Sequence, residues 1–444
     1  MTKLIEGNIP KSILKFTLPL FISNLFQLLY NTADAFIVGN FIGSSALAAV
    51  GSSESLIFLL VSFFAGLSMG SGVVCARFFG QGDKENLKSS METILIIAFV
   101  AGIALTFIGI FLAPHILRLM GTPEDVFPES TAYFRALFSG SLALVMYNMA
   151  SGILQSVGDS KTPMKFLIFS SLVNIVLDII FIAVMGLGVE FAGYATVISQ
   201  GVSAILSLRV LFTTKESYRL SIKDFKYNKD LAKKILKQGI PSGIQMSVIS
   251  IANVFVQANI NSFGAYAMAG CGAHNKIQGL AFLPINCFTI TISTFVSQNI
   301  GAGKRERVKK GIGFSLAISL IIAQVIGVLL FIFADEMVGL FSQDPKVIPY
   351  GVLNIRVTAL FYFLLAYSHC CASIMRGYGR PMVPMIIMLI VWCFFRVGFI
   401  ITVLKIVNVI DVVFWAYPVT WTISSVIFTV YVIKTIKNQG PISL

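Results

Sequence analysis

Charged residues are scarce in this chain: only 12% of its 444 residues are Asp, Glu, Lys or Arg. An ordinary soluble domain has about a quarter of its residues charged, so the composition excludes that class. Hydrophobic residues make up 56% of the chain, and they gather in runs long enough to cross a bilayer as α-helices. The runs are unbroken, whereas the strands of an outer-membrane β-barrel alternate between apolar and polar residues.

Motifs for metal and nucleotide chemistry are also missing. The six cysteines show no CxxC spacing and the three histidines are scattered, which excludes a zinc framework. The sequence closest to a phosphate-binding loop, GAGKRE, has Gln298 in place of the first glycine and Arg305 in place of Ser or Thr. We therefore expect no cofactor, and we expect an ion gradient of H⁺ or Na⁺ to drive any uphill transport.

The apolar runs predict an all-α polytopic membrane protein with twelve transmembrane helices. A cytoplasmic and a non-cytoplasmic connection then alternate along the chain. The predicted spans are 13–38, 49–75, 92–113, 133–156, 164–186, 191–212, 240–263, 276–298, 312–334, 353–375, 383–405 and 411–434.

The net charge of +13 follows this topology. Of the 33 Lys and Arg residues, 26 fall on alternate connections and therefore on one face. The positive-inside rule predicts that both termini are cytoplasmic. We expect lipid headgroups, and no nucleic acid, as the partners of this basic face. Abundant Ile, Lys and Phe with few Trp suggest a bacterium, and hence its plasma (inner) membrane.

The two halves of the sequence repeat each other at an offset of about 221 residues. FFGQGDKENLKSS (78–90) aligns with NIGAGKRERVKKG (299–311), and the same offset pairs Gly158 with Gly379. Each half holds six spans, so the two bundles share one orientation and are related by a parallel pseudo-two-fold axis. We predict an N-terminal six-helix lobe at 1–212, a cytoplasmic linker at 213–239 and a C-terminal six-helix lobe at 240–444. Two such lobes suit alternating access.

Acidic residues inside the spans are few, and Asp34 and Asp178 are the clearest. A charged Asp at the centre of a membrane helix costs about 2.5–3.5 kcal/mol, so one that is kept is expected to face a cavity or a partner. Tyr30 lies four residues before Asp34, and Asn174 lies four before Asp178, so each pair shares a helix face. Glu92 lies near a helix end, where its carboxylate is expected to reach the interface.

Paired motifs give the chain a resemblance to a known family. FFGQGD and NIGAGK follow the second and eighth spans, and GILQSVGDSKTPM (152–164) matches SIMRGYGRPMVPM (373–385) late in each half. With the six-plus-six repeat, these motifs resemble the multidrug and toxic compound extrusion (MATE) family, in particular its DinF-like branch. The resemblance covers about residues 10 to 435.

The resemblance implies a cation site in the N-terminal lobe. The family's first-helix Asp, its fifth-helix Asn-x-x-x-Asp and its sixth-helix Thr match residues of this chain, with two tyrosines in support and a proline where the first helix bends. These positions are Asp34, Asn174, Asp178, Thr196, Tyr30, Tyr133 and Pro19. The first four would hold Na⁺ if Na⁺ is the coupling ion. Protonation or Na⁺ binding at the two aspartates would bend the helix at Pro19 and close the lobe's cavity.

The resemblance implies a secondary active exporter, acting as a monomer, that exchanges organic cations or drugs for H⁺ or Na⁺. It is not expected to be an enzyme. Two alternatives stay open: a flippase for lipids or lipid-linked precursors, and a membrane-embedded enzyme. A flippase would carry a strongly basic cavity, yet only Lys276 and Arg396 are candidates for cations within the spans. The natural substrate is not identified by the sequence.

Overall fold

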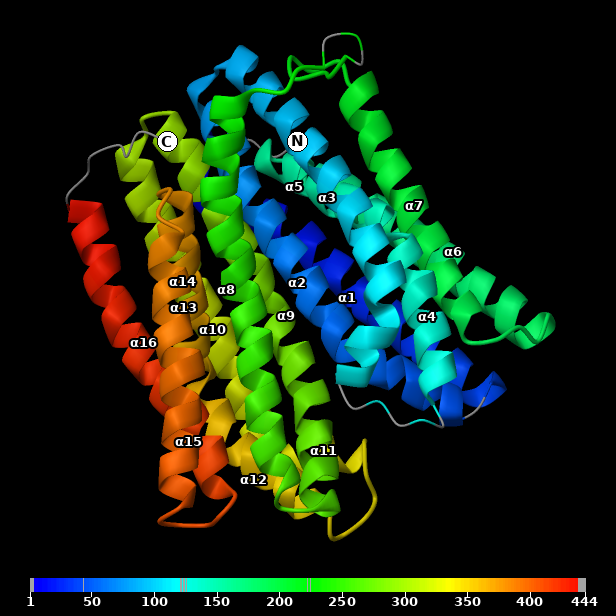
Figure 1. Cartoon of the computed structure of the whole chain (residues 1–444). Helices are drawn as coiled ribbons and strands as arrows, with labels where there is room; N and C mark the ends of the chain where they lie inside the picture. Colours follow the sequence, from blue (N-terminus) through cyan, green and yellow to red (C-terminus); the bar gives the residue numbers. More distant parts are fainter. Residues whose placement is uncertain are drawn as a thin grey trace. The chain divides into compact units, whose positions relative to one another are not determined.

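The computed structural model describes residues 4–437 apart from residues 43, 120, 121, 123, 125, 222 and 224, and it gives only the backbone at 44–49, 51–57 and 119. Regular structure in these residues is helical throughout (Figure 1). The helices of the first half of the chain are α1 (Ile9–Phe41), α2 (Ser44–Gln81), α3 (Lys84–Leu119), α4 (Phe127–Ser139), α5 (Ser141–Ser156), α6 (Lys161–Asp178), the π-helix η1 (Ile179–Val184) and α7 (Glu190–Thr213).

The second half contributes a similar series. Its helices are α8 (Lys229–Asn261), α9 (Ala265–Gly301), α10 (Arg305–Ile332), α11 (Ala334–Gly339), α12 (Ile348–Thr358), the 3₁₀ turn η3 (Ala359–Phe361), α13 (Tyr362–Gly377), α14 (Met382–Met388), the π-helix η4 (Leu389–Phe395), α15 (Arg396–Leu404) and α16 (Asp411–Lys437).

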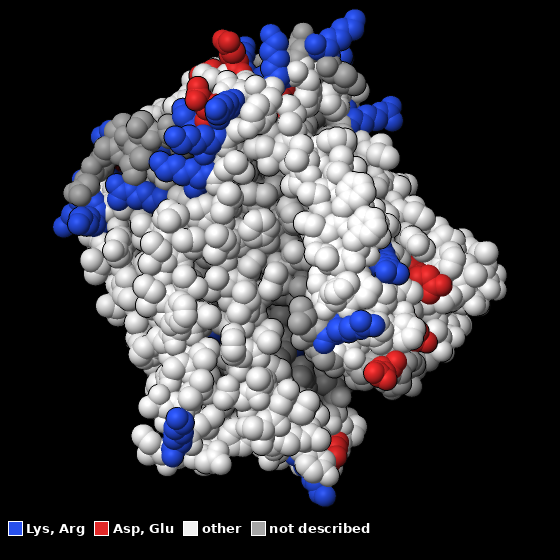
Figure 2. Space-filling model, in the orientation of Figure 1, with Lys and Arg blue, Asp and Glu red and all other residues white. Residues whose placement is uncertain are grey.

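Eleven helical stretches within the described ranges are long and apolar enough to cross a membrane. A twelfth crossing is completed by α4 and α5, which bend by 47° at Gly140. The prediction of twelve helices in two sets of six is therefore confirmed. The visible helix flanks are nearly free of charge, and Lys, Arg, Asp and Glu gather towards the helix ends (Figure 2). This distribution is the one that a hydrocarbon solvent requires.

The chain forms two compact units, whose boundaries cut through two helices. The first unit holds residues 18–239, and the second holds residues 4–17 together with 240–444. The segment predicted as a linker (213–239) thus lies in the first unit. Its apolar side chains explain this placement, because Tyr218, Leu220, Leu231 and Ile235 are buried in the first unit's core.

The first residues of each half belong to the unit that the other half forms. We call these residues the leading segments: residues 4–17 in the first half, which belong to the second unit, and residues 225–238 in the second half, which belong to the first unit. The two segments correspond at the repeat offset. The Oγ1 atoms of Thr17 and Thr291 lie 2.9 Å apart in the second unit. The corresponding positions in the first unit, Gln238 and Gly70, are also in contact. The exchange therefore obeys the same internal symmetry as the sequence repeat.

Backbone carbonyls fix the first leading segment. Arg307 donates from Nε to the carbonyl oxygen of Leu4 at 3.1 Å, and from its two Nη atoms to those of Gly7 and Glu6, both at 2.7 Å. Lys304 Nζ donates to the carbonyl of Ile5 at 2.8 Å. Four successive carbonyls are thus bound by the turn between α9 and α10. Hydrogen bonds from charged donors are among the stronger ones in proteins.

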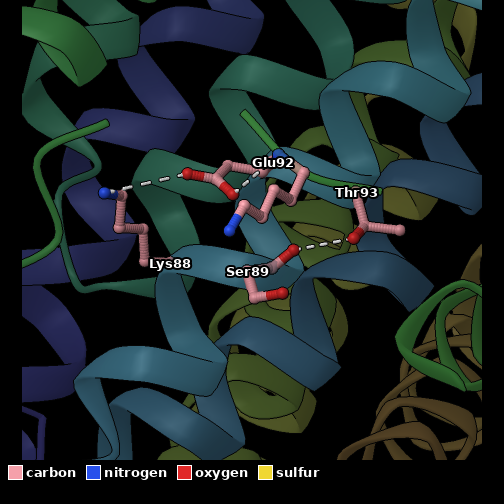
Figure 3. Close-up of polar contacts among 5 residues, drawn as sticks. Lys88, Ser89, Glu92 and Thr93 are labelled. Carbon is pink, nitrogen blue, oxygen red and sulfur yellow. Dashed lines mark hydrogen bonds and ion pairs between the residues drawn. The ribbon is translucent and has the colours of Figure 1, made fainter. Parts of the chain in front are cut away.

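The second leading segment is held by α3. The backbone N–H of Lys226 donates to Glu92 Oε2, and that of Asn228 to Thr93 Oγ1, both at 3.3 Å. Lys88 Nζ approaches Glu92 Oε1 at 3.9 Å (Figure 3). The prediction that Glu92 reaches the interface is wrong. Its residue surface is 3% exposed, because its carboxylate accepts a backbone N–H from the segment that covers it.

Two pairs of turns repeat between the halves at the sequence offset. Gly82 and Gly303 have φ of 72° and 70°, and Gly158 and Gly379 have φ of 88° and 82°. An L-residue with a side chain rarely adopts such angles. Asp83 follows the first of these turns and accepts hydrogen bonds from the N–H and Nδ2 of Asn86, which lowers the pKa of its carboxyl group.

Replacing Gly70 by Ala is expected to destabilise the protein. A Cβ atom at Gly70 would lie 2.7 Å from the Cα of Gly239 and closer still to the carbonyl of Gln238. Overpacking of this kind costs about 1–3 kcal/mol. Gly201→Ala in α7 is the control, because nothing lies within 4 Å of its added Cβ, and it should hold or raise the melting temperature. Equal melting temperatures for the two variants in detergent would contradict the contact.

Replacing Arg307 by Ala is expected to free the first leading segment. Three hydrogen bonds from a charged group are lost, each worth about 1.5–3 kcal/mol. Amide hydrogen exchange over residues 8–13 should therefore quicken by about tenfold or more. The control is Arg305→Ala, because Arg305 is exposed and its hydrogen bonds with the described residues come from its backbone. Unchanged exchange in the Arg307 variant would show that the bonds do not hold the segment.

Candidate functional site

A seam of polar side chains joins α6 to α7 inside the first unit. Ser203 Oγ donates to Ser170 Oγ at 2.6 Å. One turn further along α6, Asn174 Nδ2 lies 3.5 Å from Thr196 Oγ1. Residues 170, 174 and 178 are spaced by four, so α6 presents them on one face. The seam therefore leads directly to Asp178, whose side chain is fully buried.

Asp34 on α1 meets Asp178 at the end of this seam, with the two carboxyl groups in direct interaction. Asp34 lies seven residues before the end of α1 at Phe41. Asp178 is the last residue of α6, six residues before the end of η1, and Thr196 lies six residues into α7. All three are thus at a similar depth below one end of the unit. The π-helix η1 directly follows Asp178, and π-helical turns within α-helices often occur at functional sites.

Four oxygens of this cluster have no hydrogen-bond donor in the part of the chain that the structure describes. Among the described residues, none donates to Asp34 Oδ1, to Asn174 Oδ1 or to either carboxylate oxygen of Asp178, and all four atoms are buried. An unsatisfied buried acceptor costs about 1–3 kcal/mol, and more if it is charged. A proton shared by the carboxyl groups would remove this cost, and so would a small hard cation. Na⁺ suits a set of oxygen ligands, whereas the described part of the chain has no group of three His, Cys, Asp or Glu residues for a metal ion.

The two tyrosines are placed differently. Tyr30 lies beside Asp34, with its hydroxyl near the side-chain amides of Gln27 and Gln200. Tyr133 is 5% exposed and packs in an apolar cluster that includes Ile37 and Val38, one turn beyond Asp34. The structure thus joins Tyr30 to the carboxylates and places Tyr133 in the apolar layer next to them.

Gln200 was missed by the sequence reasoning, although a signal was present. It follows Thr196 by four residues on α7 and therefore shares its face, which brings its amide to Tyr30. Pro19 lies inside α1, two residues after the point at which this helix passes from the second unit to the first. A bend there stays a prediction.

Two parallel six-helix repeats with a buried carboxyl pair in one of them define a membrane transporter of the parallel-repeat class. The family model MatE matches residues 19–180 and again residues 241–402, so the chain belongs to the MatE family of transporters and is not an enzyme. The two matches reproduce the repeat.

Known relatives cover most of the chain. The "Probable multidrug resistance protein YpnP" of Bacillus subtilis is 29% identical over 89% of this chain and 88% of its own. The "Probable multidrug resistance protein YoeA" of the same organism is 31% identical over 85% and 83%. Among solved structures, an "Outward-facing conformation of a multidrug resistance MATE family transporter of the MOP superfamily" superposes with a TM-score of 0.92 at 24% identity over 98% of both chains. The superposition shows that the two chains share a fold.

Replacing Asp178 by Asn is expected to stabilise the protein in Na⁺-free buffer at neutral pH. An amide can donate to Asp34 and removes one of two adjacent like charges, which should contribute about 1–3 kcal/mol. Adding Na⁺ or acid should raise the melting temperature of the wild type and leave that of the variant nearly constant.

Glu85→Gln is the matched control, because Glu85 is exposed at the start of α3. It should melt like the wild type under every condition. An Asp178→Asn protein that melts below the wild type, or that responds to Na⁺ as strongly, would show that the carboxyl pair is not an ion site.

Proposed function

We propose that this protein is a secondary active multidrug exporter, driven by H⁺ or Na⁺ that binds between Asp34 and Asp178. The observation that carries the proposal is the contact of two buried carboxyl groups whose oxygens lack donors among the described residues. Two relatives named as probable multidrug resistance proteins support the export of drug-like molecules. The organic cations expected from the sequence remain the first substrates to test.

Ion binding would act through α1. This helix carries Asp34 in the first unit, while its residues 9–17 belong to the second unit. Neutralising the pair removes the repulsion between two charged carboxylates and so stabilises the packing of the outer part of α1 on α6, in which Asp34 contacts Asp178. Pro19 lacks the N–H that would complete the helical ladder at this point, so the helix bends there at low cost. Exchange of the ion for an organic molecule then alternates the two packings of α1.

The membrane potential supplies enough free energy for this exchange. One elementary charge that crosses 100 mV gains about 2.3 kcal/mol, which corresponds to an almost fiftyfold concentration ratio of the exported molecule. The basic connections at 209–237 and 304–310 support an orientation with both termini on the cytoplasmic side, and the bacterial relatives support a bacterial plasma membrane. In that orientation the carboxyl pair lies towards the outer face, where the ion enters.

Asp34→Asn is expected to abolish gradient-driven transport of ethidium in proteoliposomes. The variant keeps the shape of the side chain but cannot release a proton or neutralise Na⁺, so flux should fall by about a hundredfold to the leak rate, if the acid supplies about 2–3 kcal/mol. Imposing a pH gradient and a Na⁺ gradient separately names the coupling ion.

Glu85→Gln should transport like the wild type and controls for reconstitution. If ethidium flux through the wild type does not depend on the pH gradient or on the Na⁺ gradient, the proposal of drug export is refuted. The flipping of lipids or lipid-linked precursors would then be the leading candidate.

A further inference from the structure

The second unit holds two buried guanidinium groups. Arg396 at the start of α15 is 1% exposed, and Arg376 in the last turn of α13 is 2% exposed. The 26 Lys and Arg residues assigned to connections from the sequence include Arg376, but the structure buries this residue at the end of α13. Lys276, the other cation expected within the spans, lies in the span α9 and is exposed.

The partners of Arg396 are all neutral. Its Nε and Nη2 both donate to one oxygen, Thr420 Oγ1, at 3.1 and 2.8 Å. The guanidinium carbon lies 4.4 Å from the ring centre of Tyr417 and 5.3 Å from that of Trp392. No described residue accepts a hydrogen bond from Nη1. Three of the five N–H groups of this arginine are therefore available to an acceptor.

Carboxylates do not balance this charge. The described acidic residues of the second unit stand at helix starts and in connections, and none lies within ion-pair distance of Arg396 or Arg376; they are Glu6, Glu306, Asp335, Glu336, Asp344 and Asp411. Glu306 pairs with Lys309 and Asp335 with Arg356. Burying a cation without a counter-charge is unfavourable, and two cation–π contacts offset only part of this cost. An anionic partner would remove the remaining cost.

Aromatic rings continue from Arg396 in two directions. Tyr417 leads to Trp421 at 5.8 Å and on to Tyr362 at 6.1 Å between ring centres. The ring centres of Trp392 and His369 lie 5.3 Å apart. His369 also interacts electrostatically with Arg376. Tyr417 is partly exposed, so its ring is the part of this group that an incoming molecule would meet first. Flat ligands stack well on such surfaces.

We propose that Arg396, Trp392 and Tyr417 bind the carboxylate or phosphate group of a flat aromatic substrate inside the second unit. Arg396 receives the anionic oxygens with its free N–H groups, as guanidinium commonly does, and the rings hold the aromatic body. The inference rests on the proposed transport function and defines its cargo: aromatic anions and zwitterions in addition to cations. The first unit then binds the ion and the second binds the acidic end of the cargo.

Intrinsic fluorescence provides a direct binding test, because two of the three tryptophans, Trp392 and Trp421, belong to this aromatic group. The full chain in phosphatidylcholine nanodiscs is titrated with 2-naphthoate and with its methyl ester, without any gradient. The acid should bind at least about tenfold more tightly than the ester, since a desolvated charge pair contributes about 2 kcal/mol or more. Equal affinities would overturn the proposal without any variant.

Arg396→Met is the matching variant, because Met keeps an unbranched side chain and removes the charge. It should weaken naphthoate binding about tenfold, leave the ester unchanged, and melt no lower than the wild type, as expected when a buried charge without counter-charge is removed. A preference for the acid that survives in Arg396→Met would overturn the proposal. Arg356→Met, at an exposed ion pair, is the control and should bind both ligands like the wild type.

Two further experiments distinguish this inference from lipid headgroup binding and from the proposed transport function. Nanodiscs that contain phosphatidylglycerol should shift the naphthoate Kd by less than about threefold; competitive displacement by the lipid would assign Arg396 to a headgroup and overturn the aromatic cargo. Naphthoate binding is measured without a gradient and ethidium export with one, so a failure of anion binding at Arg396 and a failure of coupling at Asp34 are distinguished.

Discussion

The cost of holding a charge away from water governs this molecule. It explains why charged residues are rare in the chain, why most of them gather at helix ends, and why those left inside stand out. In the first unit two buried carboxyl groups, Asp34 and Asp178, contact each other, and in the second two guanidinium groups, Arg376 and Arg396, are buried. Neither pair is neutralised by the described residues of its own unit, so both are most stable when something enters from outside.

The two halves share a fold and have come to differ in chemistry. The turns at Gly82 and Gly303, and the exchange of leading segments, follow the same offset. The charged residues in the interior are not repeated at this offset. Phe255 stands where the repeat would place a second Asp34, and the π-helix precedes Arg396 in the second unit but follows Asp178 in the first. A duplicated scaffold has thus kept its architecture, while the carboxyl pair is found in the first unit and the buried residues Arg376 and Arg396 in the second.

Much of the architecture could be predicted from the sequence, because spans and repeats depend on local composition and on registered motifs. A common site for Asp34 and Asp178 was expected, since the two residues are rare acids within the spans and the resemblance to the MATE family implies that both belong to one cation site. The burial of Arg376 and Glu92 could not be foreseen. Each lies near a predicted helix end, and only the tertiary packing of a distant segment decides whether water reaches it. The spacing of four residues from Thr196 places Gln200 on the same face of α7, but the contact of its amide with Tyr30 depends on the tertiary structure.

The exchanged leading segments also set an order for assembly during synthesis. The first unit lacks its last fourteen or so residues until the ribosome has passed residue 239, and residues 4–17 have no partner until the turn between α9 and α10 has been made. The beginning of the protein is therefore among the last parts to find its place. A single half of this sequence, if it ever existed alone, would have had to pair with a copy of itself, each lending the other the start of its first helix.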